Sequence, residues 1–144
     1  MRGGRWADVP RRVRAVVAVT VAVFAYGTVV HLTQLYLGGL DPYPSMPGWL
    51  AVYFVSLTLL DPAAAVLLAL RRRAGLVLGV VVLVTDALAN AYANYVVDRA
   101  GGVTPGRVGQ AVITALAVGL LLAAPRIAPW LSGRPLFRRP LADR

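Results

Sequence analysis

Four long apolar runs, separated by short polar or Pro- and Gly-rich links, dominate the pattern of the sequence. They cover residues 15–37, 49–70, 74–97 and 108–124. Each approaches the 20 or so apolar residues that a helix needs to cross a hydrocarbon core about 30 Å thick. Because the links are short, helices that follow one another along the chain are expected to run antiparallel. The pattern therefore predicts an all-α polytopic membrane protein, built as an antiparallel up-down bundle of four transmembrane helices.

The composition agrees with a membrane location and narrows the chemistry. Hydrophobic residues make up 58% of the chain and the mean hydropathy is +0.68, whereas soluble domains are about 45–50% apolar. The absence of Cys excludes disulfides and thiolate metal sites, and one His is too few for a multi-His centre. We therefore expect neither a cofactor nor a metal site.

Arg residues are concentrated in alternate links and at the two ends. All fifteen basic residues are Arg and all six acids are Asp, a bias that is typical of a GC-rich bacterial genome. Thirteen of the Arg residues lie in segments 1–14, 71–73 and 125–144, whereas the other two links hold only Arg99 and Arg107. The positive-inside rule then predicts a bacterial inner-membrane protein with both termini in the cytoplasm.

The same distribution indicates the domain organisation and the partners. We expect a basic cytoplasmic arm at 1–14, a transmembrane bundle at 15–124 and a basic, Pro-rich cytoplasmic tail at 125–144. Topology and attraction to anionic lipid account for the net charge of +9. The expected partner is therefore the lipid bilayer and not a nucleic acid.

Three polar residues at a constant spacing of four interrupt the third run. Asp86, Asn90 and Asn94 form a slowly winding stripe on one helix. From the outer end at Val97, Asn94 lies about 5 Å deep, Asn90 about 10 Å and Asp86 about 16 Å, near the bilayer midplane. An Asp at that depth costs about 2.5–3.5 kcal/mol on insertion and usually marks a functional site. An interhelical hydrogen bond that only holds the bundle together is the alternative.

Two further polar residues lie deep in the first and second runs. His31 lies about 9 Å from the outer end of its run, and it could pair with Asp86 or Asp61, or simply bond to a neighbouring helix. Asp61 precedes Pro62, and Asp is a favoured N-cap while Pro suits the first helical position. The pair therefore predicts a capped helix restart in mid-membrane, a device that transporters also use to build binding sites.

The outer halves of all four runs carry polar residues, while the inner halves are almost purely Val, Leu, Ala and Gly. This asymmetry predicts a polar pocket that opens outward and has Asp86 at its floor. Its candidate ligand-binding residues are His31, Asp61, Asp86, Asn90 and Asn94. The pattern assigns no catalytic residue.

Small residues recur every four positions in two of the runs and predict close helix packing. The third run has Gly75 and Gly79 at its inner end, and the fourth has Ala111, Ala115, Gly119 and Ala123. We interpret both series as packing inside the bundle. A homodimer contact through the series on the fourth run is the second interpretation.

The stretch SLTLLDPAAAVLLALRRRAGLVLGVVVLVTDALAN, residues 56–90, resembles small four-span bacterial integral membrane proteins. The resemblance covers about a quarter of the chain and implies topology without an activity. In layout the chain is also similar to the emopamil-binding (EXPERA) group, in which four or five helices and buried acids surround an apolar ligand. This chain has no Glu and matches no motif of that group residue by residue, so the similarity is one of architecture.

Three functions fit these observations. The leading hypothesis is a small inner-membrane protein that binds or transports a small or lipid-like ligand, or protons, with the Asp residues as counter-charges. The second is an intramembrane lipid-modifying enzyme, such as an isomerase, with Asp86 and His31 as acid and base. The third is a structural or assembly subunit of a membrane complex, in which the polar stripe contacts another protein.

Overall fold

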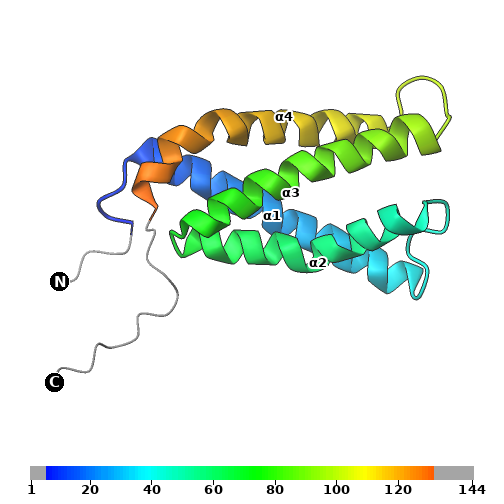
Figure 1. The fold of residues 1–144 in the computed structure, drawn as a ribbon, viewed down its shortest axis with the longest axis horizontal. Coiled ribbons are helices and arrows are strands. Elements are labelled where there is room, and N and C mark those ends of the chain that lie inside the picture. Colours follow the sequence, from blue (N-terminus) through cyan, green and yellow to red (C-terminus); the bar gives the residue numbers. More distant parts are fainter. Residues whose placement is uncertain (1–5, 132–144) are drawn as a thin grey trace.

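The computed structural model describes residues 6–131, and most of these residues are helical (Figure 1). The four long helices are α1 (Arg11–Gly38), α2 (Gly48–Ala69), α3 (Arg73–Tyr92) and α4 (Pro105–Ile127). A π-helical turn, η1 (Ala93–Val97), extends α3, and a short 3-10 turn, η2 (Ala128–Trp130), follows α4. Residues 1–5 of the predicted arm and 132–144 of the predicted tail lie outside the described residues.

The long helices run alternately in opposite directions along one axis (Figure 1). Each is long and apolar enough to cross a membrane, and the most apolar window of each has a mean hydropathy of 1.9 or 2.0. Exposed Val and Leu side chains cover the outer faces, as expected for helices that contact lipid. The predicted all-α bundle of four membrane-spanning helices is therefore confirmed.

The core lies where helices that follow one another along the chain pack together. Contacts are extensive between α1 and α2, α2 and α3, and α3 and α4, whereas α1 and α4 touch much less. The most completely buried large side chains are Phe24, Leu50, Leu57, Leu68 and Ile127. The bundle is therefore closely packed on three sides and open between α1 and α4.

Two glycines allow α3 to approach its neighbours closely. A Cβ on Gly75 would overlap the backbone of Leu67 and Leu68 in α2, and a Cβ on Gly79 would lie 3.0 Å from the ring of Phe24 in α1. Small residues at such positions let helix backbones come together. The predicted packing role of Gly75 and Gly79 is confirmed.

The small residues on α4 do not pack inside the bundle as predicted. Ala111, Ala115 and Gly119 are exposed, and a Cβ added at Gly119 would meet no atom within 4 Å. The physical reason is the rotation of α4, which directs Ala117 and Leu120 into the core instead. The interpretation as interior packing was wrong for these three residues, whereas Ala123 is partly buried against the core. The homodimer contact stays a prediction.

The predicted helix restart at Asp61 is also wrong. Helix α2 continues through Pro62, and Asp61 is buried in its interior instead of capping a new helix. Likewise α4 continues through Pro125, although we expected the fourth span to end there. A Pro removes one backbone hydrogen bond, and packing against neighbouring helices compensates for that loss in membrane helices.

Arg71, in the link between α2 and α3, contacts residues near both ends of the described chain. Its guanidinium donates to both carboxylate oxygens of Asp8, at 2.8 and 3.2 Å, and to the carbonyl of Trp130, and it lies 5.4 Å from the centre of the Trp6 ring. Trp6 in turn donates to the carbonyl of Ala69. The described chain therefore begins and ends at the same end of the bundle. This end holds Arg11, Arg12, Arg14, Arg71, Arg72, Arg73 and Arg126 and is called the Arg-rich end.

Candidate functional site

His31 of α1 and Asp61 of α2 face each other in the bundle. Nε2 of His31 lies 3.9 Å from Oδ2 of Asp61, and the two side chains are only 12% and 7% exposed. Gly27, one turn before His31, leaves the space that the Asp61 carboxyl group occupies, because a Cβ there would overlap its Oδ2 atom. The spacing of four between Gly27 and His31 thus forms a notch in α1 that receives Asp61.

The other nitrogen of His31 faces the link between α1 and α2. Nδ1 lies 3.2 Å from Oε1 of Gln34 and 3.4 Å from the hydroxyl of Tyr43, which donates to the same Gln34 oxygen at 2.6 Å. Because Oε1 is only an acceptor, Nδ1 carries the proton of a neutral His31. Its Nε2 then presents a lone pair to the Asp61 carboxyl group, so a proton or another cation is needed between the two acceptors.

Tyr43 keeps its hydroxyl neutral in this network. Burial raises the pKa of Tyr43 above its ordinary value, and the negative charge of Asp86 raises it further. The Tyr43 ring packs 5.3 Å from that of Phe54, which holds the link residue against α2. Tyr43 therefore serves as a hydrogen-bond donor next to His31.

Asp86 of α3 approaches the same region from the other side. Nδ2 of Asn90 donates to Oδ1 of Asp86 at 2.8 Å and to its backbone carbonyl at 3.0 Å, so Asn90 orients the carboxyl group. The Asp86 charge acts electrostatically on Asp61 and on Tyr53. The Tyr53 hydroxyl lies 2.8 Å from that of Thr85 and ties α2 to α3. Two acids from facing helices therefore lie within electrostatic range in mid-bundle.

Thr58 adds an unpaired hydroxyl group close to Asp61. Its hydroxyl is buried and has no hydrogen-bond partner among the described residues. Pro62 follows four positions later and has no N–H to donate to the Thr58 carbonyl. The Thr58 hydroxyl and carbonyl lie one turn before Asp61 on α2. Gly27, His31, Thr58, Asp61, Asp86 and Asn90 are called the His-Asp cluster below.

Asn94 lies one turn beyond Asn90 and serves another contact, although the sequence placed it in the same pocket. It is part of η1, where its Nδ2 donates to the carbonyl of Asn90 at 2.9 Å. Its side-chain oxygen would overlap a Cβ on Gly106, and its carbonyl accepts from Arg107 at 3.4 Å. Asn94 therefore connects the end of α3 to the start of α4.

The polar residues of α4 likewise serve the contact with α3. Nε2 of Gln110 donates to the carbonyl of Ala87 and to the hydroxyl of Thr114, both at 2.9 Å. Gln110 is buried, and its Oε1 has no partner among the described residues. The polar N-terminal half of α4 therefore packs against α3.

Four of the five candidate residues lie in the same region of the bundle. The outward-opening pocket that the sequence predicts around them stays a prediction. His31 pairs with Asp61, and Asn90 pairs with Asp86, whose charge acts on Asp61, whereas an apolar hollow lies elsewhere, between the halves of α1 and α4 next to the Arg-rich end. Within residues 6–131, no three His or acidic side chains come close enough to hold a metal ion.

Sequence reasoning missed Tyr43 and Tyr53. Tyr53 lies two turns before Asp61 on the same helix, and this spacing could have indicated that the two share a face. Tyr43 lies in the Pro-rich link between α1 and α2, where no periodic pattern gives its direction.

Four spans and a group of buried polar side chains define the chain as a multi-pass membrane protein. Compared with protein-family models, with curated proteins and with solved structures, the chain shows no match. Its function is therefore inferred from the chemistry of the His-Asp cluster.

Proposed function

We propose that this protein binds a cation in the His-Asp cluster, either a proton or a small, lipid-like organic cation. The observation that carries the proposal is the proximity of two acids, the buried Asp61 and the partly buried Asp86, with His31 as the neighbouring base. Every Arg within residues 6–131 lies at a helix end or in a link. Two carboxylates in hydrocarbon without such a counter-charge require a proton or a bound cation.

The unpaired hydroxyl of Thr58 supports a bound species next to Asp61. Buried hydroxyl groups normally have a hydrogen-bond partner, and a site that awaits a ligand is one reason for an exception. Carboxylate, hydroxyl and carbonyl oxygens together suit a hydrogen-bond donor such as a hydronium or an ammonium group.

The proposed route of access begins at the link between α1 and α2. Gln34 and Tyr43 lie on that side of His31, and they connect it to the end of the bundle opposite the Arg-rich end. Thirteen Arg residues lie in the arm, the 71–73 link and the tail. By the positive-inside rule, we propose that the Arg-rich end lies on the cytoplasmic side of a bacterial inner membrane. The cluster then communicates with the outer side.

A lipid-modifying enzyme is the second candidate, and the pairing of His31 with Asp61 favours it. An imidazole facing a carboxyl group is a common acid–base arrangement, and the closest approach involves Asp61 instead of the Asp86 that the sequence suggested. In this reading, the two groups would exchange a proton with a bound lipid during an isomerisation.

Proton movement is tested first with purified protein in liposomes that contain a pH-sensitive dye. A potassium diffusion potential drives protons inward, and the wild-type rate is compared with those of Asp61→Asn and Asp86→Asn. We expect both variants to lose the flux, because an amide cannot carry the proton. The exposed Asp41 in the outer link provides the matched control, Asp41→Asn, which should retain the flux.

Native mass spectrometry of the same proteins tests the organic cation. A molecule that copurifies with the wild type and with Asp41→Asn, but not with Asp61→Asn, identifies the ligand. A bound lipid that is converted during incubation would favour the isomerase. If neither proton flux nor bound molecules distinguish the wild type from folded Asp61→Asn and Asp86→Asn variants, the proposal is wrong and the cluster only holds the helices together.

A further inference from the structure

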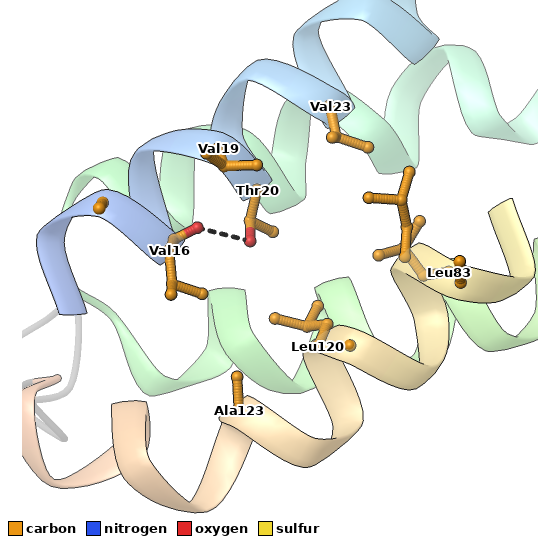
Figure 2. A pocket seen from close by; sticks show the side chains of 11 residues that line it. Val16, Val19, Thr20, Val23, Leu83, Leu120 and Ala123 are labelled. Atoms are coloured by element: carbon orange, nitrogen blue, oxygen red, sulfur yellow. Dashed lines mark hydrogen bonds between the residues drawn. The ribbon is translucent and has the colours of Figure 1, made fainter. Parts of the chain in front are cut away.

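An apolar groove runs between α1 and α4 in the half of the bundle next to the Arg-rich end (Figure 2). Its volume is about 370 Å³. The lining residues come from α1, α3 and α4, and are Ala15, Val16, Val19, Thr20, Val23, Leu83, Ala115, Leu116, Gly119, Leu120 and Ala123. The hydroxyl of Thr20 donates to the carbonyl of Val16 in its own helix, so it offers the groove no free hydrogen-bond donor.

The length of the groove matches one leaflet of a bilayer. From Ala15 to Val23 the lining residues of α1 extend about 12 Å along the helix, and the hydrocarbon of one leaflet is about 15 Å deep. The lining residues of α4 span the same distance, from Ala115 to Ala123. A groove of this length, closed at mid-bundle by Val23 and Leu83, fits an acyl chain that enters from the Arg-rich end.

Three Arg residues lie at the open end of the groove. Arg11 and Arg12 precede Ala15 and Val16 by one turn, and thus continue the groove-lining face of α1. Arg126 follows Ala123 by one turn on α4. All three are exposed, and the ion pairs of the described residues, His31 with Asp61 and Arg71 with Asp8, include none of them.

We infer that the groove binds one acyl chain of an anionic phospholipid, whose phosphate is held by Arg11, Arg12 and Arg126. The apolar lining matches the chain, and the Arg side chains match the headgroup charge. The first turn of α1 adds to this attraction, because Pro10 supplies no side-chain cap and the turn contains no acid. This inference is independent of the function proposed for the His-Asp cluster.

Charge also argues against a second copy of the chain as the occupant. Helices that crossed at Ala115, Gly119 and Ala123 in a parallel dimer would bring two sets of these Arg residues together. Like charges at close range oppose that contact, whereas an anionic lipid removes the repulsion. The structure therefore favours a lipid in the groove.

Native mass spectrometry of the full-length protein tests the site with two probes that differ only in headgroup charge. Dioleoyl phosphatidylglycerol should bind more tightly than dioleoyl phosphatidylcholine. Because an Arg near a membrane surface contributes about 1 kcal/mol to anionic lipid binding, Arg12→Gln should lower the phosphatidylglycerol affinity about fivefold. Arg99→Gln, at the opposite end of the bundle, is the matched control and should leave it unchanged.

Filling the groove provides the second arm of the test. Gly119→Leu places a side chain in the groove, whereas Gly109→Leu, on the outer part of the same helix, also enters open space but lies outside it. We expect only Gly119→Leu to release the bound phosphatidylglycerol, with both variants folded by circular dichroism. Equal binding of the two lipids, or loss in the Arg variant without loss in Gly119→Leu, would overturn the site. A wild-type dimer that Gly119→Leu dissociates, with lipid binding unaltered, would identify a second copy as the occupant instead.

Discussion

The carboxyl group of Asp61 occupies the space that a side chain at Gly27 would need. Oδ2 of Asp61 would overlap the Cβ of any other residue at position 27, and the same atom is 3.9 Å from Nε2 of His31. Glycine at this position therefore does more than permit close packing. It determines where the buried carboxyl group lies relative to its imidazole partner.

Gly27→Ala should therefore displace the Asp61 carboxyl group without unfolding the protein. The overlapping atom is the end of a side chain that can rotate, and Ala also favours the helix more than Gly does, by about 0.5–1 kcal/mol. We expect thermal unfolding in detergent to shift by only a few degrees, while proton flux or ligand content falls to the level of Asp61→Asn. The double variant should lose nothing further, because both changes act on one interaction. Independent, additive losses would contradict this coupling.

The contact of α3 with α2 should be far less tolerant of an added methyl group. Gly75→Ala directs a Cβ into the backbone of Leu67 and Leu68, which cannot rotate away, so we expect a loss of about 3 kcal/mol in unfolding free energy. Gly119→Ala is the matched control on α4, where the Cβ meets open space. It should leave stability unchanged or raise it by about 0.5–1 kcal/mol. Denaturant titration in mixed micelles measures both, and equal effects at the two positions would refute the packing argument.

Arg71 combines a strained backbone with an extensive set of contacts. Its φ angle of 58° lies in the left-handed region, which costs a residue other than Gly about 1–2 kcal/mol. Arg71→Ala should lose the contacts with Asp8, Trp6 and Trp130 and keep the strain, whereas Arg71→Gly should lose the contacts and relieve it. We therefore expect the Gly variant to be the more stable of the two by about 1 kcal/mol in thermal unfolding. An Ala variant as stable as the Gly variant would show that the left-handed turn is not retained.

The Asp8–Arg71 pair should make stability depend on pH in the acid range. The hydrogen bonds from Arg71 hold the pKa of Asp8 below its ordinary value. A carboxyl group whose pKa is lowered by folding stabilises the protein above its unfolded pKa of about 4, and this contribution is lost as the pH falls through the folded value. The difference in melting temperature between wild type and Asp8→Asn should therefore shrink as the pH is lowered from 6 to 3. A difference that stays constant over that range would mean that the pair contributes through packing alone.

Much of the architecture follows from local pattern. The length of the apolar runs, the short links between them and the clustering of Arg residues predict four spans that alternate in direction, because hydrocarbon thickness and helix rise are the same for every span. The deep positions of His31, Asp61 and Asp86 follow equally from counting residues along a helix. Gly75 and Gly79 could be recognised as contact positions because only small residues let helix backbones approach.

Helix rotation and pairing required the tertiary structure. A helix in lipid is apolar on every side, so its sequence contains little information about which face turns inward. For this reason the small residues of α4 were expected in the core but border an open groove, and His31 meets Asp61 through the notch at Gly27. The continuation of α2 through Pro62 was unpredictable for the same reason, since neighbouring helices decide whether a missing hydrogen bond is tolerated. The sequence by itself thus determined the number of the spans and their alternating direction, and the packing of the helices decided which polar groups face one another.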